Sequence, residues 1–349
     1  TIQMFNIKKF ILKSIFILTL LSLIHINLES KSESELNIYS GRKLHLIDPL
    51  IKEFEKDYKI KVNITTGKAD EFIERLKLEK KNTKADILLT TDIARLSRAK
   101  KNNLFQKVNS EILKNNIPSK YTSKDFDWFG FSIRARPIIY SKERINKNEL
   151  KNYENLADAK WNKKICMRSS NNVYNQSLIS YMIINLGEKR TDLWIKNLIK
   201  NFARKPYGGD RDQIKAIASG QCDITVANTY YLANMLNSKN EKDRNAAKKV
   251  SLFWPNQNTF GTHINLSGAG IIKDSKNYDN AVLFLEFLSS QKAQEIYTKK
   301  INEYSIRKDV EPSKIVFKFG KFKSDDKQLH EIGKEIEKAI YLSSKNDWK

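Results

Sequence analysis

Asp86-Ile87-Leu88-Leu89-Thr90 is a short apolar run with polar residues at both ends. Runs of this kind are typical of strands in parallel sheets, which helices cover on both faces. Residues 36–40 and 60–64 also predict strands, and apolar residues recur at helical spacing after each of them. Strands that alternate with helices indicate an α/β fold. Because the ligands of such folds bind beyond the carboxyl ends of the strands, we expect a binding site in the loops that follow them.

A second alternation of strands and helices begins near Lys164. It comprises a strand over 165–167, a polar loop, a helix over 177–186, a helix over 212–218 and a strand over 223–227. Two longer strand-like segments, 128–140 and 263–272, bracket this set. We expect these two segments to cross between two lobes.

Three tyrosines follow strands of the second set. Tyr230 and Tyr231 come after the strand over 223–227, and Tyr174 lies in the polar loop after 165–167. Phenolate oxygen is a hard, anionic donor, and hard cations prefer oxygen ligands. A free phenol ionises only near pH ~10, so a metal bound here has to drive the proton off, as ferric iron can. A tyrosine pair on a strand also fits plain packing, with one ring on each face of the sheet, and the residues alone leave both interpretations open.

The chain has 349 residues, enough for two domains with separate cores, and a formal net charge of +23. The positive charge is spread along the whole length, mostly as lysine, which is typical of a solvated surface. The sequence has no zinc-finger spacing and no aromatic RNA-binding motif, so we expect no nucleic-acid partner, although the charge keeps a nucleic-acid or membrane-surface binder as the alternative class. It has no Ser-His-Asp order and no phosphate-binding loop of the Walker type, and we expect no enzyme.

The N-terminal segment predicts export. Lys8, Lys9 and Lys13 precede the apolar run 15–24, and a polar stretch follows that run. A basic segment before an apolar run of this length is typical of a secretory signal peptide. We therefore assign residues 1–30 to a signal peptide and expect a periplasmic protein, with an uncleaved membrane anchor as the alternative.

Cys166 and Cys222 are the only cysteines of the sequence. In an oxidising compartment an even pair is a disulfide candidate. Each cysteine opens a predicted strand, so both can lie at the same edge of a sheet. Two buried free thiols are the alternative, and the sequence does not decide between them.

Taken in order, several motifs between roughly residues 36 and 310 resemble the ferric-binding family of bacterial iron uptake, two-lobed solute-binding proteins of ABC transporters. These motifs are Asn37-Ile38-Tyr39-Ser40-Gly41-Arg42, Thr66-Gly67-Lys68-Ala69-Asp70, Ala85-Asp86-Ile87-Leu88-Leu89-Thr90-Thr91-Asp92, Trp128-Phe129-Gly130, Arg134-Ala135-Arg136, Cys166-Met167-Arg168-Ser169-Ser170, Gly208-Gly209-Asp210-Arg211-Asp212-Gln213, Ala227-Asn228-Thr229-Tyr230-Tyr231 and Gly261-Thr262-His263. The resemblance implies an α/β, two-lobed periplasmic binding protein fold of type 2, with two mixed sheets that are flanked by helices and joined by two crossing hinge strands. We expect residues 35–133 with 264–309 to form the first lobe, and 134–263 with 310–345 to form the second.

The resemblance also implies a set of metal ligands. In that family three tyrosines of the second lobe bind Fe³⁺, and they correspond to Tyr174, Tyr230 and Tyr231. Many members have a His and a Tyr directly after the arginine of the first strand, but those positions hold Lys43 and Leu44 here, and neither suits Fe³⁺. The chain is therefore similar to the branch in which the three tyrosines are the protein ligands and an anion such as carbonate helps to complete the coordination.

Three arginines are candidates for holding that anion or for supporting the ligand side chains: Arg42, Arg134 and Arg136. A guanidinium binds a planar oxyanion through two parallel hydrogen bonds. His45, which follows the first strand, is a candidate for an additional iron ligand.

The function that the resemblance implies is capture and delivery. We expect a monomeric, extracytoplasmic protein that closes its lobes around Fe³⁺, with carbonate as the candidate synergistic anion. It would pass the iron to an inner-membrane ABC permease that works with a cytoplasmic ATPase. A binding protein of the same fold for an oxyanion or a small organic solute is the alternative function.

Overall fold

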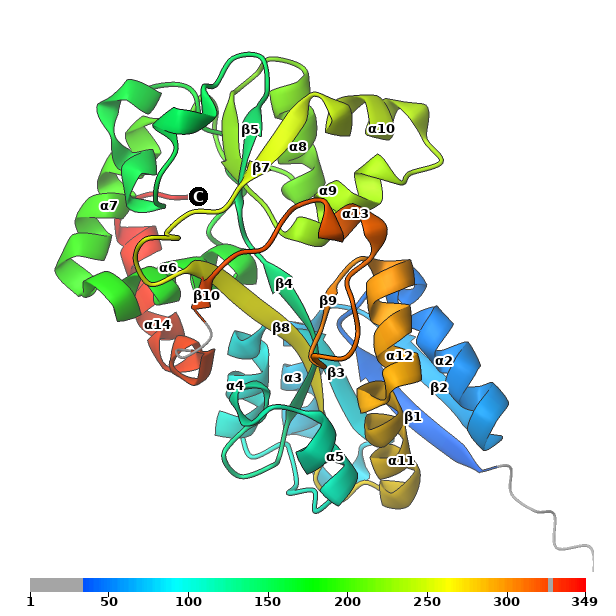
Figure 1. Cartoon of the computed structure of the whole chain (residues 1–349). Coiled ribbons are helices and arrows are strands. Elements are labelled where there is room, and N and C mark those ends of the chain that lie inside the picture. The colour runs from blue at the N-terminus through cyan, green and yellow to red at the C-terminus, as the bar shows by residue number, and fades with distance from the viewer. Residues whose placement is uncertain (1–33, 326–328) are drawn as a thin grey trace, which may run out of the picture.

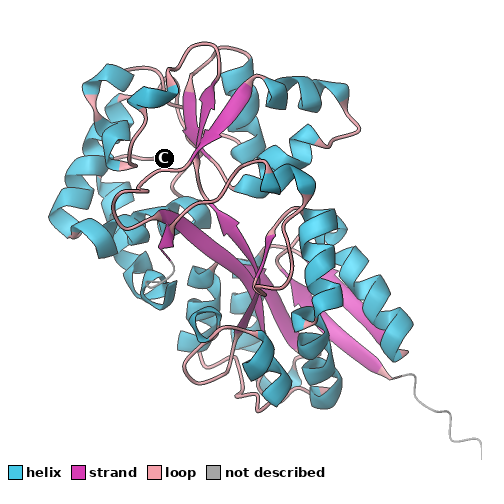
Figure 2. Ribbon diagram, in the orientation of Figure 1, coloured by secondary structure: helices cyan, strands magenta, loops and turns pink. Residues whose placement is uncertain are grey.

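The part of the chain that the structure describes forms two sheets, and helices surround each of them (Figure 1, Figure 2). The computed structural model describes residues 34–325 and 329–349, and the predicted signal peptide at 1–30 lies outside them. The architecture is the α/β fold that the sequence predicted. Within the described part of the chain, no helix has the length and apolar character needed to cross a membrane.

The first sheet contains the strands predicted in the N-terminal part of the chain. Its strands are β1 (Glu35–Ser40), β2 (Lys61–Thr66), β3 (Ile87–Thr91), β4 (Phe129–Ala135), β8 (Thr262–Ile271), β9 (Tyr304–Ser305) and β10 (Ser324–Asp325). The order is β2-β1-β3-β8-β4-β9, with β10 paired to β8. β1 is parallel to β2 and β3, whereas β8 is antiparallel to β3 and β4, so the sheet is mixed. Every residue of β3, the strand of the Asp86 run, is buried.

Helices from the N-terminal third of the chain and from a later segment lie around this first sheet. They are α2 (Leu44–Tyr58), α3 (Ala69–Glu79), α4 (Ile93–Lys101), α5 (Glu111–Asn116), α11 (Tyr278–Ser289) and α12 (Gln291–Ile296). The apolar stripe of α2 buries Leu50 and Phe54, and that of α3 buries Phe72, Ile73 and Leu76. The helical spacing of apolar residues, noted in the sequence after the first two strands, thus corresponds to the buried faces of these helices.

The second sheet is small and is formed by the middle of the chain. Its strands are β5 (Ile138–Ser141), β6 (Ile224–Val226) and β7 (Val250–Phe253), in the order β6-β5-β7 with antiparallel neighbours. The predicted strand over 165–167 is wrong beyond Ile165, which forms isolated parallel bridges to Phe202 and Ile224 before the chain turns away into a loop. The helices here are α6 (Val173–Leu186), α7 (Glu188–Lys200), α8 (Asp210–Ala218), α9 (Thr229–Leu236), α10 (Glu241–Lys248) and α13 (Lys314–Phe317).

Two segments of the chain join the sheets, and each includes one of the two predicted crossing strands (Figure 1). The segment 128–140 is two strands rather than one, because Pro137 has no N–H to donate to a ladder. It divides into β4 in the first sheet and β5 in the second, and the chain returns from β7 into β8. The N–H of Arg136 donates to the carbonyl of His263 (3.0 Å), so the two segments remain hydrogen-bonded where the chain enters the second sheet.

The segments that carry the three tyrosines are helical. The prediction of a loop at Tyr174 is wrong, because α6 begins at Val173 and the Asn172 side chain caps it by accepting the N–H of Tyr174 (2.9 Å). Tyr230 and Tyr231 likewise lie in the first turn of α9 instead of in a loop after β6. The first turn of a helix favours negative charge, which suits a phenolate.

The last helix, α14 (Leu329–Lys345), joins the two halves of the molecule by packing against both α4 and α6 (Figure 1). Leu329 and Ile332 lie in the core of the first sheet. Ala339 and Leu342 lie in the core of the second, whereas Ile340 is 44% exposed. The buried face changes along α14 because the helix leaves one core and enters the other.

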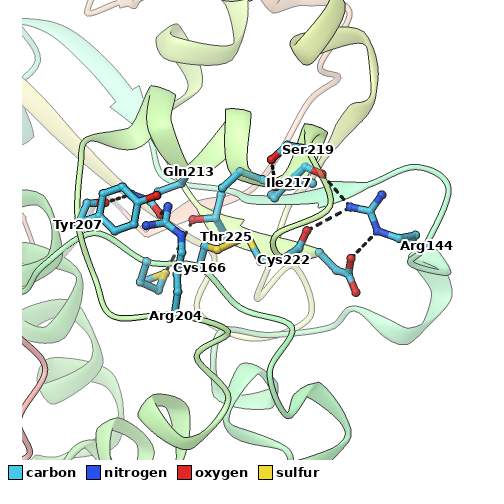
Figure 3. The surroundings of a disulfide bond; sticks show 12 residues. Arg144, Cys166, Arg204, Tyr207, Gln213, Ile217, Ser219, Cys222 and Thr225 are labelled. Atoms are coloured by element: carbon cyan, nitrogen blue, oxygen red, sulfur yellow. Dashed lines mark hydrogen bonds and ion pairs between the residues drawn. A yellow bond between two sulfur atoms is a disulfide. The ribbon is translucent and has the colours of Figure 1, made fainter.

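Cys166 and Cys222 form a disulfide beside the second sheet (Figure 3). Both residues are buried, and the N–H of Cys166 donates to the carbonyl of Ile224 (2.9 Å). The bond thus fastens the segment that leads to Tyr174 to the start of the strand that leads to Tyr230. It settles the choice that the sequence left open.

Replacing both cysteines by serine is expected to lower the free energy of unfolding by about 2–4 kcal/mol, because the bond spans a sequence separation of 56 residues and restricts the unfolded chain. Urea unfolding followed by circular dichroism, with and without reductant, measures this difference. Reductant should destabilise the wild type and leave the double-serine variant unchanged. Equal unfolding midpoints for the wild type and the double-serine variant in the absence of reductant would contradict the prediction.

Candidate metal centre

The side chains of the three predicted tyrosines lie close together in the structure. The hydroxyl oxygens of Tyr174 and Tyr230 lie 3.4 Å apart, although 56 residues separate them in sequence. The ring centroids of Tyr230 and Tyr231 are 4.2 Å apart at an interplanar angle of 31°. Helix α6 supplies the first phenol and helix α9 the other two, so the packing of these helices determines the arrangement.

All three phenols line a single cavity of about 510 Å³. Segments after β1, β2 and β3 form one side of it, and α6, α8 and α9 contribute to the other. This is the place predicted for a ligand, beyond the carboxyl ends of the parallel strands. The cavity-lining residues include six basic side chains and two acidic ones: Arg42, Lys43, Lys68, Arg95, Arg168 and Arg211, with Asp70 and Glu303.

Three guanidinium groups surround the ring of Tyr174. Those of Arg134, Arg168 and Arg136 lie 5.0, 5.3 and 5.8 Å from the ring centroid. Burial raises the pKa of this phenol, but the positive charge of Arg134 and the side-chain hydrogen bonds with Tyr230 and Thr91 outweigh burial and lower the pKa below its ordinary value of 10.0. Tyr174 is therefore the phenol most easily ionised in this cluster.

The other two phenols are held in their neutral form. Burial raises the pKa of Tyr230, and the negative charges of Tyr174 and Tyr231 raise it further. Burial likewise raises the pKa of Tyr231, with further contributions from Tyr174 and Asp210. Three phenolates this close repel one another, so full ionisation requires a cation between them.

A buried ion-pair network fixes the helices that carry the phenols. Asp210 accepts hydrogen bonds from Arg136 (2.9 Å), from Arg168 (3.0 Å) and from the backbone N–H of Asn228 (2.8 Å). Arg136 also donates to the side chains of Asn175 (2.8 Å) and Asn228 (3.1 Å), which lie next to Tyr174 in α6 and directly before α9. Burial disfavours ionisation of Asp210, but Arg136 and Arg168 outweigh it and hold the pKa of the carboxyl below its ordinary value.

The three arginines predicted from the sequence occupy different positions. Arg42 lines the cavity and forms a buried ion pair with Glu303 (2.9 Å). Arg134 and Arg136 lie beside the Tyr174 ring and pair with the buried carboxylates of Asp92 (3.3 Å) and Asp210 (2.9 Å).

Other predicted and unpredicted residues line the same cavity. His45 is there with Lys43, and its pKa is lowered by partial burial and by the charges of Lys43, Arg211 and Arg42. Arg168 and Arg211 lie inside the motifs that carried the resemblance, yet the sequence assigned them no role. The available signal was that Arg168 follows the predicted strand over 165–167 and that Arg211 lies at the start of α8. The described residues contain no cluster of three or more His, Cys, Asp or Glu side chains suited to a metal ion.

The similarity of this chain to known proteins covers residues of both sheets. Residues 49–324 match the family described as bacterial extracellular solute-binding protein. The chain is 43% identical over 317 residues to iron uptake protein A1 of Synechocystis sp., a match that covers 91% of this chain and 88% of the relative.

Two solved structures are similar over 90% of this chain and 100% of their own. One is a Trichodesmium protein in complex with iron and citrate ligands, with a TM-score of 0.86 and 42% identity. The other is a ferric binding protein from Campylobacter jejuni, with a TM-score of 0.87 and 41% identity. As the order of its motifs predicted, the chain belongs to the family of bacterial extracellular solute-binding proteins.

Proposed function

We propose that this protein captures Fe³⁺ outside the cytoplasm through Tyr174, Tyr230 and Tyr231 and delivers it to an ABC permease. The observation that carries the proposal is the convergence of three phenols, two of them 3.4 Å apart, in one cavity. The relatives named as iron uptake and ferric binding proteins support the same metal. They are transport proteins, and this protein is not an enzyme.

The chemistry of the site favours a hard trivalent cation. Three phenolates balance the charge of Fe³⁺, and their oxygens are the donors that a hard cation prefers. The lowered pKa of Tyr174 favours it as the first phenolate to bind, and the positive charge of the iron then offsets the repulsion that keeps Tyr230 and Tyr231 neutral. Binding therefore exchanges protons for metal.

An anion is proposed to complete the coordination. The cavity-lining residues carry more basic than acidic side chains, while iron with three phenolates adds no net charge. Carbonate is the proposed anion, and the citrate in the similar Trichodesmium complex supports an anionic co-ligand there. Arg42 lines the cavity and is the proposed contact, Arg134 and Arg136 support Tyr174, and His45 is the proposed additional ligand.

Delivery is proposed to use the movement of two lobes. We assign residues 35–133 with 264–309 to the first lobe and 134–263 with 310–345 to the second, with β4 and β8 as the hinge strands. Within the second assignment, β10 and the first half of α14 pack on the first sheet, so this segment would bridge the two lobes. The closed, monomeric protein would dock on the inner-membrane permease, and the cytoplasmic ATPase would drive transport. Export by the segment 1–30 would place the protein in the periplasm, and no nucleic-acid partner is proposed.

Loading the purified, iron-free protein with ferric citrate tests this function. We expect a red-orange colour from phenolate-to-iron charge transfer and one Fe³⁺ per chain by metal analysis. Repeating the loading with a ferric chelate free of citrate, with and without bicarbonate, identifies the anion. A protein that stays colourless and binds citrate or another small anion without iron would establish the alternative, a binding protein for an oxyanion or an organic solute.

A further inference from the structure

Trp348 lies far from the tyrosines in sequence, but its side chain is fully buried in the core of the second sheet. Its ring contacts those of Trp194 and Phe202, with centroid distances of 6.3 and 5.8 Å. Helix α14 leads the chain to this position by packing against α6. Trp348, three residues after the end of α14, is thus part of the core of the second sheet.

Trp348 also makes two polar contacts with the loop before α6. Its indole N–H donates to the backbone carbonyl of Arg168 (3.1 Å), and its own carbonyl accepts a hydrogen bond from the hydroxyl of Ser170. The same Arg168 carbonyl accepts from the Asn175 side chain (2.9 Å). The backbone at Arg168 is therefore held from the C-terminal segment and from α6 together.

The side chain of Arg168 belongs to the metal centre. It lines the cavity, donates to Asp210 (3.0 Å) and lies 5.3 Å from the ring centroid of Tyr174. A guanidinium in this position favours the ionised form of a neighbouring phenol. Its distance from the phenols depends on where the loop backbone is held.

We propose that Trp348 is a positioning residue for the iron site, acting through the backbone of Arg168 and Ser170. The proposal rests on the proposed function. Trp348 holds the loop so that the Arg168 guanidinium stays between Asp210 and the phenols. Iron affinity then depends on a side chain at the far end of the chain that does not touch the metal.

Trp161 provides a matched control for this residue. It is also a buried tryptophan in the core of the second sheet, 2% exposed. Its indole N–H has no hydrogen-bond partner within the described residues. Trp348→Phe and Trp161→Phe each shrink one buried ring in the same core, but only the first removes a hydrogen bond to the loop of the metal centre.

The experiment measures Fe³⁺ affinity by competition with citrate, the pH of half-release and the thermal stability of the iron-free protein. We expect Trp348→Phe to weaken Fe³⁺ binding by about tenfold and to raise the pH of half-release, because the backbone that holds the Arg168 guanidinium beside the proposed ligands loses one of its hydrogen bonds. Trp161→Phe should lower thermal stability comparably and leave both iron readouts at the wild-type value. Ser170→Ala should shift the iron readouts in the same direction as Trp348→Phe.

Equal iron affinities for the two tryptophan variants would overturn the positioning role while leaving the proposed function intact. A wild-type protein that binds no Fe³⁺ would overturn both. If Trp348→Phe fails to fold, Ser170→Ala is compared with Ser180→Ala as its control. Ser180 is a buried serine of α6 whose hydroxyl donates to the backbone carbonyl of Gln176 in the same helix (3.0 Å). Identical iron binding by these two serine variants would then refute the proposal.

Discussion

Tyr230→Phe is expected to reduce the affinity for Fe³⁺ by about 100-fold or more and to remove most of the charge-transfer colour. Loss of a group that merely orients a ligand costs about 10–100-fold in metal affinity, and Tyr230 is proposed as a ligand itself. It is also the central phenol of the three, with its hydroxyl 3.4 Å from that of Tyr174 and its ring against that of Tyr231. Phenylalanine keeps the ring and removes only the donor oxygen.

Tyr304→Phe is the matched control for this change. The Tyr304 hydroxyl is buried and has no hydrogen-bond partner within the described residues, and the ring lies at the end of the first sheet in β9. Titration with ferric citrate, followed in the visible spectrum, should show wild-type affinity and colour for this variant. Wild-type colour in Tyr230→Phe as well would show that the tyrosine cluster does not hold the metal.

The second large effect is a steep loss of iron affinity as the pH falls. Burial raises the pKa of Tyr230 and Tyr231 above the ordinary phenol value, so both are protonated in the iron-free protein at neutral pH. Iron has to displace these protons, and a lower pH favours the protonated, iron-free state. The apparent affinity should therefore fall by about tenfold per pH unit for each proton displaced.

Proton release measured in weakly buffered solution during iron loading checks the number of protons directly. The slope of the logarithm of the affinity against pH should equal the number of protons released per iron. The lowered pKa of Tyr174 predicts that this phenol contributes the smallest share of the release near pH 8. An affinity independent of pH between about 6 and 8 would rule out phenolate ligation.

Local sequence patterns predicted most of the helices and strands, but they wrongly predicted loops at the two segments that carry the tyrosines. The apolar run at Asp86 became a buried strand, and the spacing of Phe72 and Leu76 identified the inward face of α3. The sequence predicts loops at Tyr174 and Tyr230 because the residues there are polar or aromatic and lack the apolar stripe of a surface helix. They are helical since α6 and α9 are buried on several sides and need no such stripe.

The candidate site was predicted in part. Tyr174, Tyr230 and Tyr231 were identified from their order among the motifs, and the structure brings them into one cavity with Arg42 and other basic residues. Their role as ligands stays a prediction. The positioning role proposed for Trp348 has no local signature, because its hydrogen-bond acceptor is a backbone carbonyl and any residue type at position 168 would supply one.

The α/β class, the family and the candidate phenols could all be predicted from the sequence, because periodicity and motif order are properties of neighbouring residues. The distance between Tyr174 and Tyr230, the disulfide between Cys166 and Cys222 and the network around Asp210 required the folded structure. These features join segments that are tens of residues apart. Their geometry follows from how α6, α8 and α9 pack around the second sheet, and packing at that range is not written in any local pattern.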